Sequence, residues 1–365
     1  MILYVWKCDE NDQFSRIAVI DNAHSVIWIN RYKTAGQFEI YISATPELLT
    51  MFRQNNLFVT KENDQKNAMK VQHVQLTTDP ENGDYLIISG KSAACIIGQR
   101  IVRSQRNLND TAQNCVYSIL NDECVNPQGS GTLPKLRKMN VLSIQQTTLP
   151  TSVNFNMQYY GENLLDVVDD ICEIGEFGYK VEFTGTGFVF SLYAGLDRTI
   201  NQKVNTHVIF SDDYENLGQG SYTYDNTTFH NSAIAMGEGN GTGKLVGGVT
   251  VQDAGAGIRL FETKIDGSDV SRTTNSGEMS QQEYLNMLQQ LCRIYLAKSK
   301  ATEDFSADIL NSNFYEYGTD YSLGDKVTVI NRYGIIGAAI VAEVTEVEDE
   351  TGYRLIPTLT DWSVN

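Results

Sequence analysis

The sequence predicts a mainly β chain with α+β insertions. Short segments that alternate apolar and polar residues recur from residue 1 to about 104 and again from about 206 to the end. Between these regions, residues 105–205 mix helical and strand patterns, and a second helical pattern at about 280–300 interrupts the later strands. We therefore expect three domains, at residues 1–104, 105–205 and 206–365.

The first region is expected to form seven strands separated by turn clusters. They are Leu3 to Trp6, Arg16 to Ile20, Ser25 to Asn30, Phe38 to Ile42, Leu57 to Thr60, Met69 to Thr77 and Tyr85 to Gly90. Short strands at this spacing favour a small barrel or sandwich. Lys91 to Gln99 is predicted to be a short helix that follows the last strand.

The middle region combines helices with a hairpin. Helical patterns cover Leu108 to Leu120 and Gly161 to Ile174. Two alternating strands, Tyr179 to Phe183 and Phe188 to Leu192, then flank a glycine-rich turn. A helix followed by a hairpin is typical of a small α+β domain.

The last region returns to strands around one long helix. The expected strands are Val208 to Phe210, Ser221 to Asp225, Ser232 to Met236, Gly247 to Val251 and Ile258 to Thr263. A capping box from Ser280 to Glu283 predicts the start of the helix. The aromatic stretch from Phe314 then leads into strands at residues 327–329, 334–341 and 342–348.

Composition describes a folded chain without a membrane span. The 365 residues are 41% hydrophobic and include only six prolines, so disorder is not expected. No apolar run approaches the ~18 residues that cross a bilayer, and the first residues lack the charged region of a signal peptide. We expect no stable membrane insertion.

The net charge of −17 disfavours binding to nucleic-acid phosphates, which needs clustered Lys and Arg. Taken alone, this acidity most simply serves solubility. A conduit through which DNA slides would also benefit from a negative wall, because like charges repel.

Six cysteines, at positions 8, 95, 115, 124, 172 and 292, are scattered without a C-x-x-C pair. Cys95 and Cys172 lie in apolar surroundings, which favours buried free thiols. A pair between Cys115 and Cys124 stays open, although a chain folded in a reducing cytosol rarely keeps disulfides.

The sequence predicts no cofactor and no metal site. Gly237 to Lys244 is glycine-rich, but it lacks the spacing and the Ser or Thr of a phosphate-binding loop. A loop between strands is the better interpretation. The four histidines, at 24, 73, 207 and 230, are too far apart for a sequence-local metal site.

No catalytic residue is predicted either. Candidate acid pairs for a glycosidase are Asp169-Asp170, Asp212-Asp213 and Glu348-Asp349-Glu350. Neighbours in sequence point in different directions on a helix or a strand, so none of these runs is a catalytic pair by itself. The chain contains no Gly-x-Ser-x-Gly elbow, His-Glu-x-x-His or other hydrolase signature.

Three further sets of motif residues carry a family resemblance. The first set is Arg31, Tyr32, Gly36, Phe38, Glu39, Gly90 and Ser92, the second is Gly237, Glu238 and Gly239, and the third is Tyr317, Asp320, Tyr321, Leu323, Gly324 and Asp325. With them the chain resembles the tail-hub, or baseplate-hub, proteins of long-tailed bacteriophages. That family includes the amino-terminal hub region of tail-associated lysins and the Gp37-like tail proteins of siphophages.

The resemblance implies a tail-hub architecture with two small β-barrel-like domains, an α+β domain and an inserted helix. Three subunits would form a ring that closes the distal end of the tail tube, with a channel for DNA release. The implied partners are the chain itself as a homotrimer, the distal tail protein, the tape measure protein and tip or receptor-binding proteins. DNA would pass through without specific binding. The subunit would belong to the virion after assembly in the host bacterial cytoplasm, and its motif residues would be assembly elements.

Two alternatives remain open. In the resembling family, peptidoglycan hydrolysis belongs to a domain appended after the hub region, and this chain is expected to stop at Asn365 just after the final hub strand. We therefore expect a protein that is not an enzyme. A carbohydrate-binding tip module is the other alternative, since aromatics such as Tyr315 and Tyr317 are able to stack on sugars.

Overall fold

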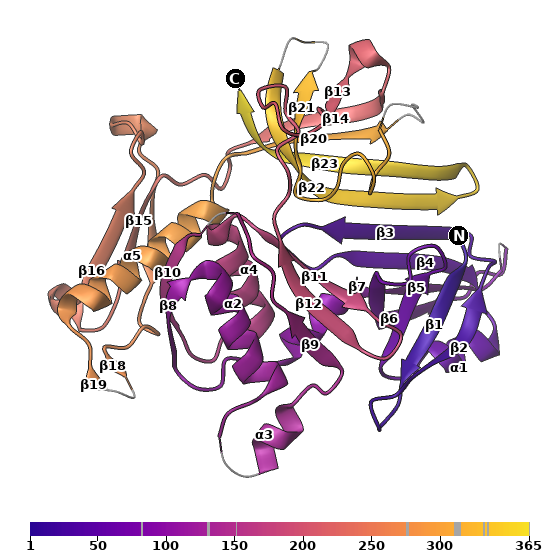
Figure 1. The fold of residues 1–365 in the computed structure, drawn as a ribbon, viewed down its shortest axis with the longest axis horizontal. Coiled ribbons are helices and arrows are strands. Elements are labelled where there is room, and N and C mark those ends of the chain that lie inside the picture. The colour runs from indigo at the N-terminus through magenta and orange to yellow at the C-terminus, as the bar shows by residue number, and fades with distance from the viewer. Residues whose placement is uncertain are drawn as a thin grey trace.

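The computed structural model describes residues 1–81, 83–129, 132–150, 152–274, 277–309, 315–330, 333 and 336–364. It contains a β unit from each end of the chain and an α+β body beside them (Figure 1). The predicted fold class, mainly β with α+β insertions, is confirmed.

The first β unit contains all seven expected strands. They are β1 (Leu3–Cys8), β2 (Phe14–Ile20), β3 (Ser25–Arg31), β4 (Gln37–Ser43), β5 (Leu57–Lys61), β6 (Ala68–Thr77) and β7 (Tyr85–Ser92), followed by the 3-10 helix η1 (Ala93–Gln99). One helix, α1 (Pro46–Phe52), was not predicted. Its signals are Thr45, whose side chain accepts a hydrogen bond from the Leu48 amide, and Pro46 in the first turn.

The α+β body begins with a strand that corrects one prediction. Its elements are β8 (Arg106–Thr111), α2 (Ala112–Leu120), the π-helix η2 (Asn121–Val125), α3 (Thr132–Arg137), β9 (Leu142–Gln145), β10 (Asn154–Tyr159), α4 (Leu164–Gly175), β11 (Gly178–Phe183) and β12 (Phe188–Tyr193). The helix predicted from Leu108 begins only at Ala112. Residues before it pair with β10, and the Thr111 side chain caps the helix by accepting from the Asn114 amide.

The second β unit surrounds an insertion. Its elements are β13 (Ile209–Ser211), η3 (Asp212–Tyr214), β14 (Leu217–Asp225), β20 (Thr302–Ile309), β21 (Lys326–Ile330), β22 (Ile336–Asp349) and β23 (Gly352–Val364). The insertion contains β15 (Ser232–Met236), η4 (Gly241–Gly243), β16 (Val246–Thr250), η5 (Gly257–Arg259), β17 (Glu262–Asp266), β18 (Thr273–Thr274), β19 (Gly277–Glu278) and α5 (Gln281–Lys298). The expected capping box of α5 is present.

Two strand predictions in this region were partly wrong. The strand expected from Ile258 begins at Glu262, because residues 257–259 form a 3-10 turn that opens at Gly257 with a φ of +63°. The two strands expected at residues 334–348 are one long strand, β22, from Ile336 onward. Phe314, Gly334 and Ile335 lie outside the described residues.

One sheet runs through both β units. Its strand order is β14-β20-β23-β22-β3-β4-β7-β6-β5-β1-β2, and β21 and β13 extend from β22. The units join where β22 pairs antiparallel with β3, from Glu343 opposite Arg31 to Glu348 opposite Val26 (Figure 1). We call this β3–β22 pairing the inner seam.

The two β units repeat one strand order, but β1 pairs antiparallel with β5 while β13 pairs parallel with β21, and β2 has no counterpart among the described strands. The first has the order β3-β4-β7-β6-β5-β1 and the second has β14-β20-β23-β22-β21-β13. A register shift between Val71 and His73 in β6 has a counterpart between Val341 and Glu343 in β22. No repeat is visible in the residues themselves, so the likeness is one of strand order. Among the described strands, each unit is an open path, with no pairing of β2 with β3 or of β13 with β14.

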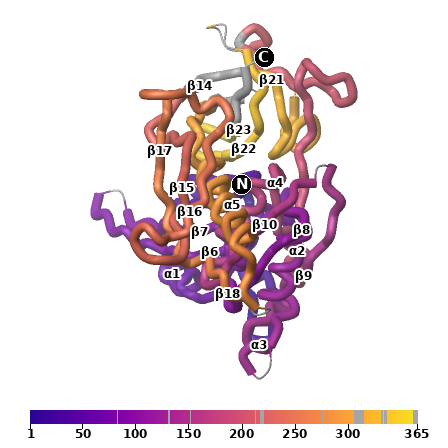
Figure 2. Tube along the Cα trace, turned by 90° about the vertical axis from the view of Figure 1, so that its left-hand side faces the viewer, coloured from indigo at the N-terminus to yellow at the C-terminus, as the bar shows by residue number. Residues whose placement is uncertain are grey.

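Three hydrophobic clusters lie within the described residues. One lies in the first β unit around Trp28, and another lies in the second around Phe210. The largest belongs to the α+β body and includes Tyr284, Leu288 and Cys292 of α5, so the insertion packs with that body. Figure 2 shows α3 projecting from the end of the molecule opposite β21. The expected division at residues 104 and 205 stays a prediction.

Candidate functional site

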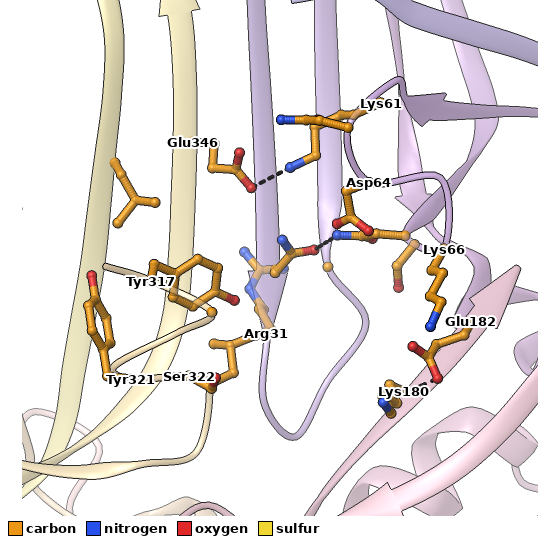
Figure 3. Close-up of a pocket in the computed structure, with 18 of the residues that line it drawn as sticks. Arg31, Lys61, Asp64, Lys66, Lys180, Glu182, Tyr317, Tyr321, Ser322 and Glu346 are labelled. Carbon is orange, nitrogen blue, oxygen red and sulfur yellow. Dashed lines mark hydrogen bonds and ion pairs between the residues drawn. The ribbon is translucent and has the colours of Figure 1, made fainter. Parts of the chain in front are cut away.

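A cavity of about 1220 Å³ lies where the two β units and the α+β body meet. Its wall is built from β3, the β5–β6 turn, β11, residues 315–323 and the start of β23 (Figure 3). Of the predicted motif residues, Arg31, Gly36, Ser92, Tyr317, Tyr321 and Leu323 line it. The sequence motifs from both ends of the chain therefore converge at one junction.

A buried ion pair spans this junction. Lys61 Nζ lies 2.5 Å from Glu346 Oε1, and the two side chains are only 4% and 8% exposed (Figure 3). The Tyr353 hydroxyl donates to the other Glu346 oxygen at 3.1 Å. Because buried charges need partners, this pair fixes how the two β units sit against each other. Sequence reasoning missed Lys61 and Glu346, which carry no local signal of burial.

Arg31 and Gly36 shape the rim of the cavity. Arg31 Nε donates to Glu343 Oε2 at 2.7 Å across the inner seam, and its Nη1 donates to the Ala35 carbonyl at 3.2 Å. A Cβ at Gly36 would lie 2.2 Å from the Ile29 carbonyl oxygen. The Gly36 carbonyl accepts from the Ser92 amide at 2.9 Å, so glycine lets two turns meet here.

Tyr32 contacts both the α+β body and the second β unit. A Cβ at Gly178 or at Gly324 would lie 2.3 or 2.4 Å from its ring, so the ring is wedged between two glycines. Its amide donates to the Ala342 carbonyl at 2.9 Å, and its hydroxyl accepts from the Gly195 amide at 3.3 Å. Burial raises the pKa of Tyr32, which keeps the hydroxyl neutral.

Asp325 anchors the turn that follows. Its carboxylate accepts from the Leu196 amide and from Arg198 Nε, each at 2.7 Å, and from the Ser322 amide at 3.0 Å. Gly324 has a φ of +87°, a conformation that favours glycine. The Leu323-Gly324-Asp325 turn is thereby tied to the segment that leaves the α+β body.

The aromatic motif forms part of the core of the second β unit. Tyr321 packs edge-to-face on Phe210 at 5.3 Å and on Tyr317 at 5.6 Å between ring centroids. Asp320 accepts from the Glu316 amide at 2.8 Å, which shapes the loop between the tyrosines. Burial raises the pKa of both Tyr317 and Tyr321 far above its usual value, so neither hydroxyl ionises near neutral pH.

Three motif residues lie away from the cavity in the first β unit. Phe38 is buried 5.7 Å from the Trp28 ring, and Glu39 points outward from β4. A Cβ at Gly90 would lie 1.9 Å from the Lys70 carbonyl oxygen, next to the register shift in β6. These residues support the strand pairing of the unit.

The Gly237-Glu238-Gly239 loop holds helix α5 in place. The Tyr284 hydroxyl accepts from the Glu238 amide at 2.7 Å, and Glu238 Oε1 accepts from the Arg272 amide at 3.0 Å. A Cβ at Gly237 would lie 2.2 Å from the Tyr284 hydroxyl, and Gly239 has a φ of +116°. The loop does not reach the cavity, since none of its residues lines it.

In two of the three candidate acid runs, carboxylates bind other side chains or the amino terminus. Asp169 accepts from the Tyr179 hydroxyl at 2.7 Å, and burial raises its pKa to about 7. Asp170 forms an ion pair with Lys298. Glu348 pairs with the Met1 amino group, and Asp349 accepts from Arg354 at 2.8 Å. The side chain of Asp212 lies outside the described residues.

Within the described ranges, no three His, Cys, Asp or Glu side chains gather as metal ligands. No helix in the same ranges combines the length and apolar character needed to cross a membrane. Cys95 and Cys172 are buried free thiols, as expected.

Comparison with known proteins gives a matching family and several solved structures with a similar fold. The family described as Siphovirus ReqiPepy6 Gp37-like protein matches residues 2–359. No curated protein sequence gives a significant match. Among solved structures, the chain is similar to the 43 kDa tail protein of prophage MuSo2 from Shewanella oneidensis, with a TM-score of 0.58, 11% identity and 98% of both chains covered.

Two other solved proteins have a similar fold. A tail protein from Neisseria meningitidis MC58 matches with a TM-score of 0.55 and 11% identity over 98% of this chain and 96% of that one. Prophage tail protein gp18 from Listeria monocytogenes EGD-e matches with a TM-score of 0.53 and 11% identity over 99% and 94%. At this identity the likeness is one of fold.

Proposed function

This chain belongs to the Siphovirus ReqiPepy6 Gp37-like protein family, and from that premise we propose that it is a structural subunit of a phage tail tip. Membership confirms the resemblance to phage tail proteins, and the three solved tail proteins share its fold. In the proposal, three copies form a hub ring that closes the distal end of the tail tube, anchors tip or receptor-binding proteins and leaves a channel for DNA release.

The repeated strand order of the two β units carries this proposal. Each chain presents two units of the same strand order in one sheet, so three chains would present six near-equivalent units. Such a trimer would match a sixfold tube without needing six subunits. The 1–104, 105–205 and 206–365 division remains the proposed domain plan, with the insertion packed on the α+β body.

The motif residues would serve this role by keeping the junction rigid. Tyr32 and Asp325 each tie two parts of the molecule together, and the Lys61–Glu346 pair crosses between the β units. A ring closes only if the angle between its units is well defined. We therefore assign Arg31, Tyr32, Gly324 and Asp325 to setting that angle.

The proposed partners are further copies of the chain, the distal tail protein, the tape measure protein and tip or receptor-binding proteins. The net charge of −17 supports a channel that DNA crosses without adhering. The proposed location is the virion, after assembly in the host cytoplasm.

Hydrolysis of peptidoglycan is the competing activity. Asp169 has the raised pKa of an acid catalyst, but it is bound to the Tyr179 hydroxyl, and Asp170 is bound to Lys298. Structural roles explain both contacts, so we propose a subunit that is not an enzyme. Lysis zones from the purified chain on a cell-wall zymogram would contradict this.

Carbohydrate binding is a second candidate function for the cavity. Tyr179, Tyr193 and Tyr317 line it together with charged side chains such as Lys66 and Asp64, a mixture that suits a polar ligand with flat faces. Titration with cell-wall glycans by calorimetry tests this role, and Tyr317→Ala should abolish any heat that arises from the cavity.

Cryo-electron microscopy of the intact tail tip, reconstructed without imposed symmetry, tests the hub. Three copies of this fold in a ring at the end of the tube are expected. A peripheral position, or a stoichiometry other than three, would overturn the proposal and favour the glycan-binding or hydrolytic alternatives.

A further inference from the structure

The inner seam shows how a strand of one β unit pairs with a strand of the other. There, the carboxyl-terminal half of β22 pairs antiparallel with β3. Glu343 lies opposite Arg31, Glu346 opposite Trp28, and Glu348 opposite Val26. The seam thus joins a strand of the second β unit to a strand of the first.

The repeated strand order gives each seam strand an equivalent in the other unit. β6 occupies in the first unit the place that β22 has in the second, and β14 occupies in the second the place of β3. The shared register shift aligns His73 with Glu343.

Ladder partners extend this alignment to β14. In the first unit, Trp28 of β3 pairs with Phe38 of β4. Phe38 pairs with Gly90 of β7, and Gly90 pairs with Val71 of β6. In the second unit, Tyr222 of β14 pairs with Phe305 of β20. Phe305 pairs with Leu359 of β23, and Leu359 pairs with Val341 of β22. Tyr222 is therefore the equivalent of Trp28, and Asp225 is the equivalent of Arg31.

The equivalents of the seam strands each have an edge, or a stretch of one, with which no other described strand pairs. β6 pairs with β5 only from Ala68 to Lys70, which leaves one edge of residues 71–77 open. β14 ends the sheet and pairs with β20 alone. Open edges are places where another strand adds to a sheet.

From these observations we propose that β6 of one copy pairs antiparallel with β14 of the next copy, in the register of the inner seam. The register places His73 opposite Asp225, Leu76 opposite Tyr222 and Thr77 opposite Ser221. We call this pairing the outer seam. It deepens the proposed hub and rests on it, because the occupant is a second copy of this chain.

The side chains at the two open edges fit this pairing. Leu76 is 43% exposed, while Tyr222 and Tyr224 are 38% and 60% exposed. On β6, Val74 and Leu76 occupy the positions that Val344 and Glu346 have on β22. On β14, Tyr222 and Tyr224 occupy the positions that Trp28 and Asn30 have on β3, and all four inner-seam positions lie on its inward face. Pairing would remove these apolar groups from water, and His73 beside Asp225 would restore a complementary contact where Glu343 meets Arg31.

The geometry of the contact differs from that of a symmetric dimer. The contact joins two different strands, so each copy would use β6 to bind one neighbour and β14 to bind the other. Such a contact builds a ring if the rotation closes and a filament if it does not.

Cysteine cross-linking of the full chain tests the register. The Leu76→Cys/Tyr222→Cys variant places two thiols at directly opposed positions, where Cβ atoms of cross-strand pairs lie about 4.5–5.5 Å apart. The control, Leu76→Cys/Asp225→Cys, shifts one thiol by three residues, about 10 Å along the strand. Single variants measure any background from Cys8, which is half-buried, and from the other native thiols.

We expect mild oxidation to convert the aligned variant into covalent trimers, with at least tenfold less product from the shifted control. Sedimentation of the unmodified chain gives the size of the assembly independently. A trimer that forms without aligned cross-links, or with equal cross-links in both variants, overturns the outer seam and leaves the hub proposal standing. A chain that stays monomeric and uncross-linked at every concentration also overturns it, and the tail-tip reconstruction then judges the hub separately.

Discussion

At the scale of residues, the junction depends on side chains that each contact more than one part of the molecule. Tyr32 touches the α+β body through Gly178 and the second β unit through Gly324. Asp325 binds the segment at Leu196 and Arg198. Loss of one such side chain should therefore loosen two contacts at once.

Tyr32→Ala should lower the free energy of unfolding by about 3–5 kcal/mol, because it leaves a ring-sized cavity between two glycines that cannot fill it. Tyr32→Phe keeps the ring and loses the hydroxyl, which accepts from the Gly195 amide, so it should cost about 1 kcal/mol. Urea unfolding of both variants checks the difference. Equal losses would show that the hydroxyl, and not the ring, holds the junction.

Lys61→Met should cost about 3–5 kcal/mol, since it leaves the Glu346 carboxylate buried without its cation. Lys61→Met/Glu346→Leu should recover most of that loss, because no charge remains to be buried. The matched control is Lys180→Ala, whose pair with Glu182 is half-exposed and should be worth about 0–1 kcal/mol. A Lys61→Met variant as stable as this control would refute the role of the pair.

Asp169→Asn should change how stability depends on pH. Burial raises the pKa of Asp169 from 3.8 to about 7 in the folded chain, so the folded state holds a proton that the unfolded state has lost between these values. Wild-type stability should fall as pH rises through that window and then level off. The variant cannot ionise there, and its advantage should grow by about 1–4 kcal/mol from pH 4 to pH 8.

Thermal unfolding at several pH values measures this advantage. Asp253→Asn removes a carboxylate that is exposed, and it serves as the matched control. A constant difference between Asp169→Asn and wild type across the range would contradict the predicted coupling.

At the scale of elements, local signals decide which helices were predictable. The start of α5 was predicted because Ser280 and Glu283 form a complete capping box in four residues. The helix predicted from Leu108 is present from Ala112, and its first four residues are strand for a tertiary reason, since residues 106–111 pair with β10. The periodicity of apolar residues in a segment shows which of its faces is buried. It does not show whether the segment pairs with a strand elsewhere in the chain.

Ser280→Ala should destabilise the protein by about 1 kcal/mol, because the Glu283 amide loses its side-chain acceptor at the first turn of α5. The control is Ser118→Ala, an exposed serine inside α2, which should be neutral or slightly stabilising since alanine is the better helix former. Calorimetric melting of both variants is the measurement. Equal effects at the two positions would argue against a capping role.

At the scale of the whole molecule, the sequence could predict strand-rich ends and a mixed centre but not how they join. Part of the first motif set and the third set meet at one junction, while the Gly237-Glu238-Gly239 loop lies elsewhere. The residues that bridge the junction also include Lys61 and Glu346, which are 285 positions apart. The inner seam pairs β3 with β22 and has no local signal. The repeated strand order could not be predicted either, because the two β units share that order without sharing a pattern of residues.

Val344→Pro should disrupt the inner seam, at a cost of about 3 kcal/mol or more, since proline inside a sheet removes a ladder donor. The Ala342 carbonyl accepts from the Tyr32 amide, so the alternation of the strand also directs the Val344 amide toward β3. Amide hydrogen exchange in β3 and β22 should accelerate together, by about 100-fold, because each strand loses the other as its partner. Glu350→Pro, at the turn between β22 and β23, is the control and should leave both strands protected. Faster exchange in β22 alone would mean that the two units are not coupled through this seam.

Covalent linkage of the two β units affects how strong the inner seam must be. β3 and β22 are held in one chain, so each meets the other at a high effective concentration that does not depend on how much protein a cell makes. Ion pairs such as Arg31–Glu343 are sufficient in that setting. Two separate chains would have to find each other by diffusion and pay the full entropy of association. The apolar Leu76, Tyr222 and Tyr224 at the open edges are the kind of side chains that untethered partners need.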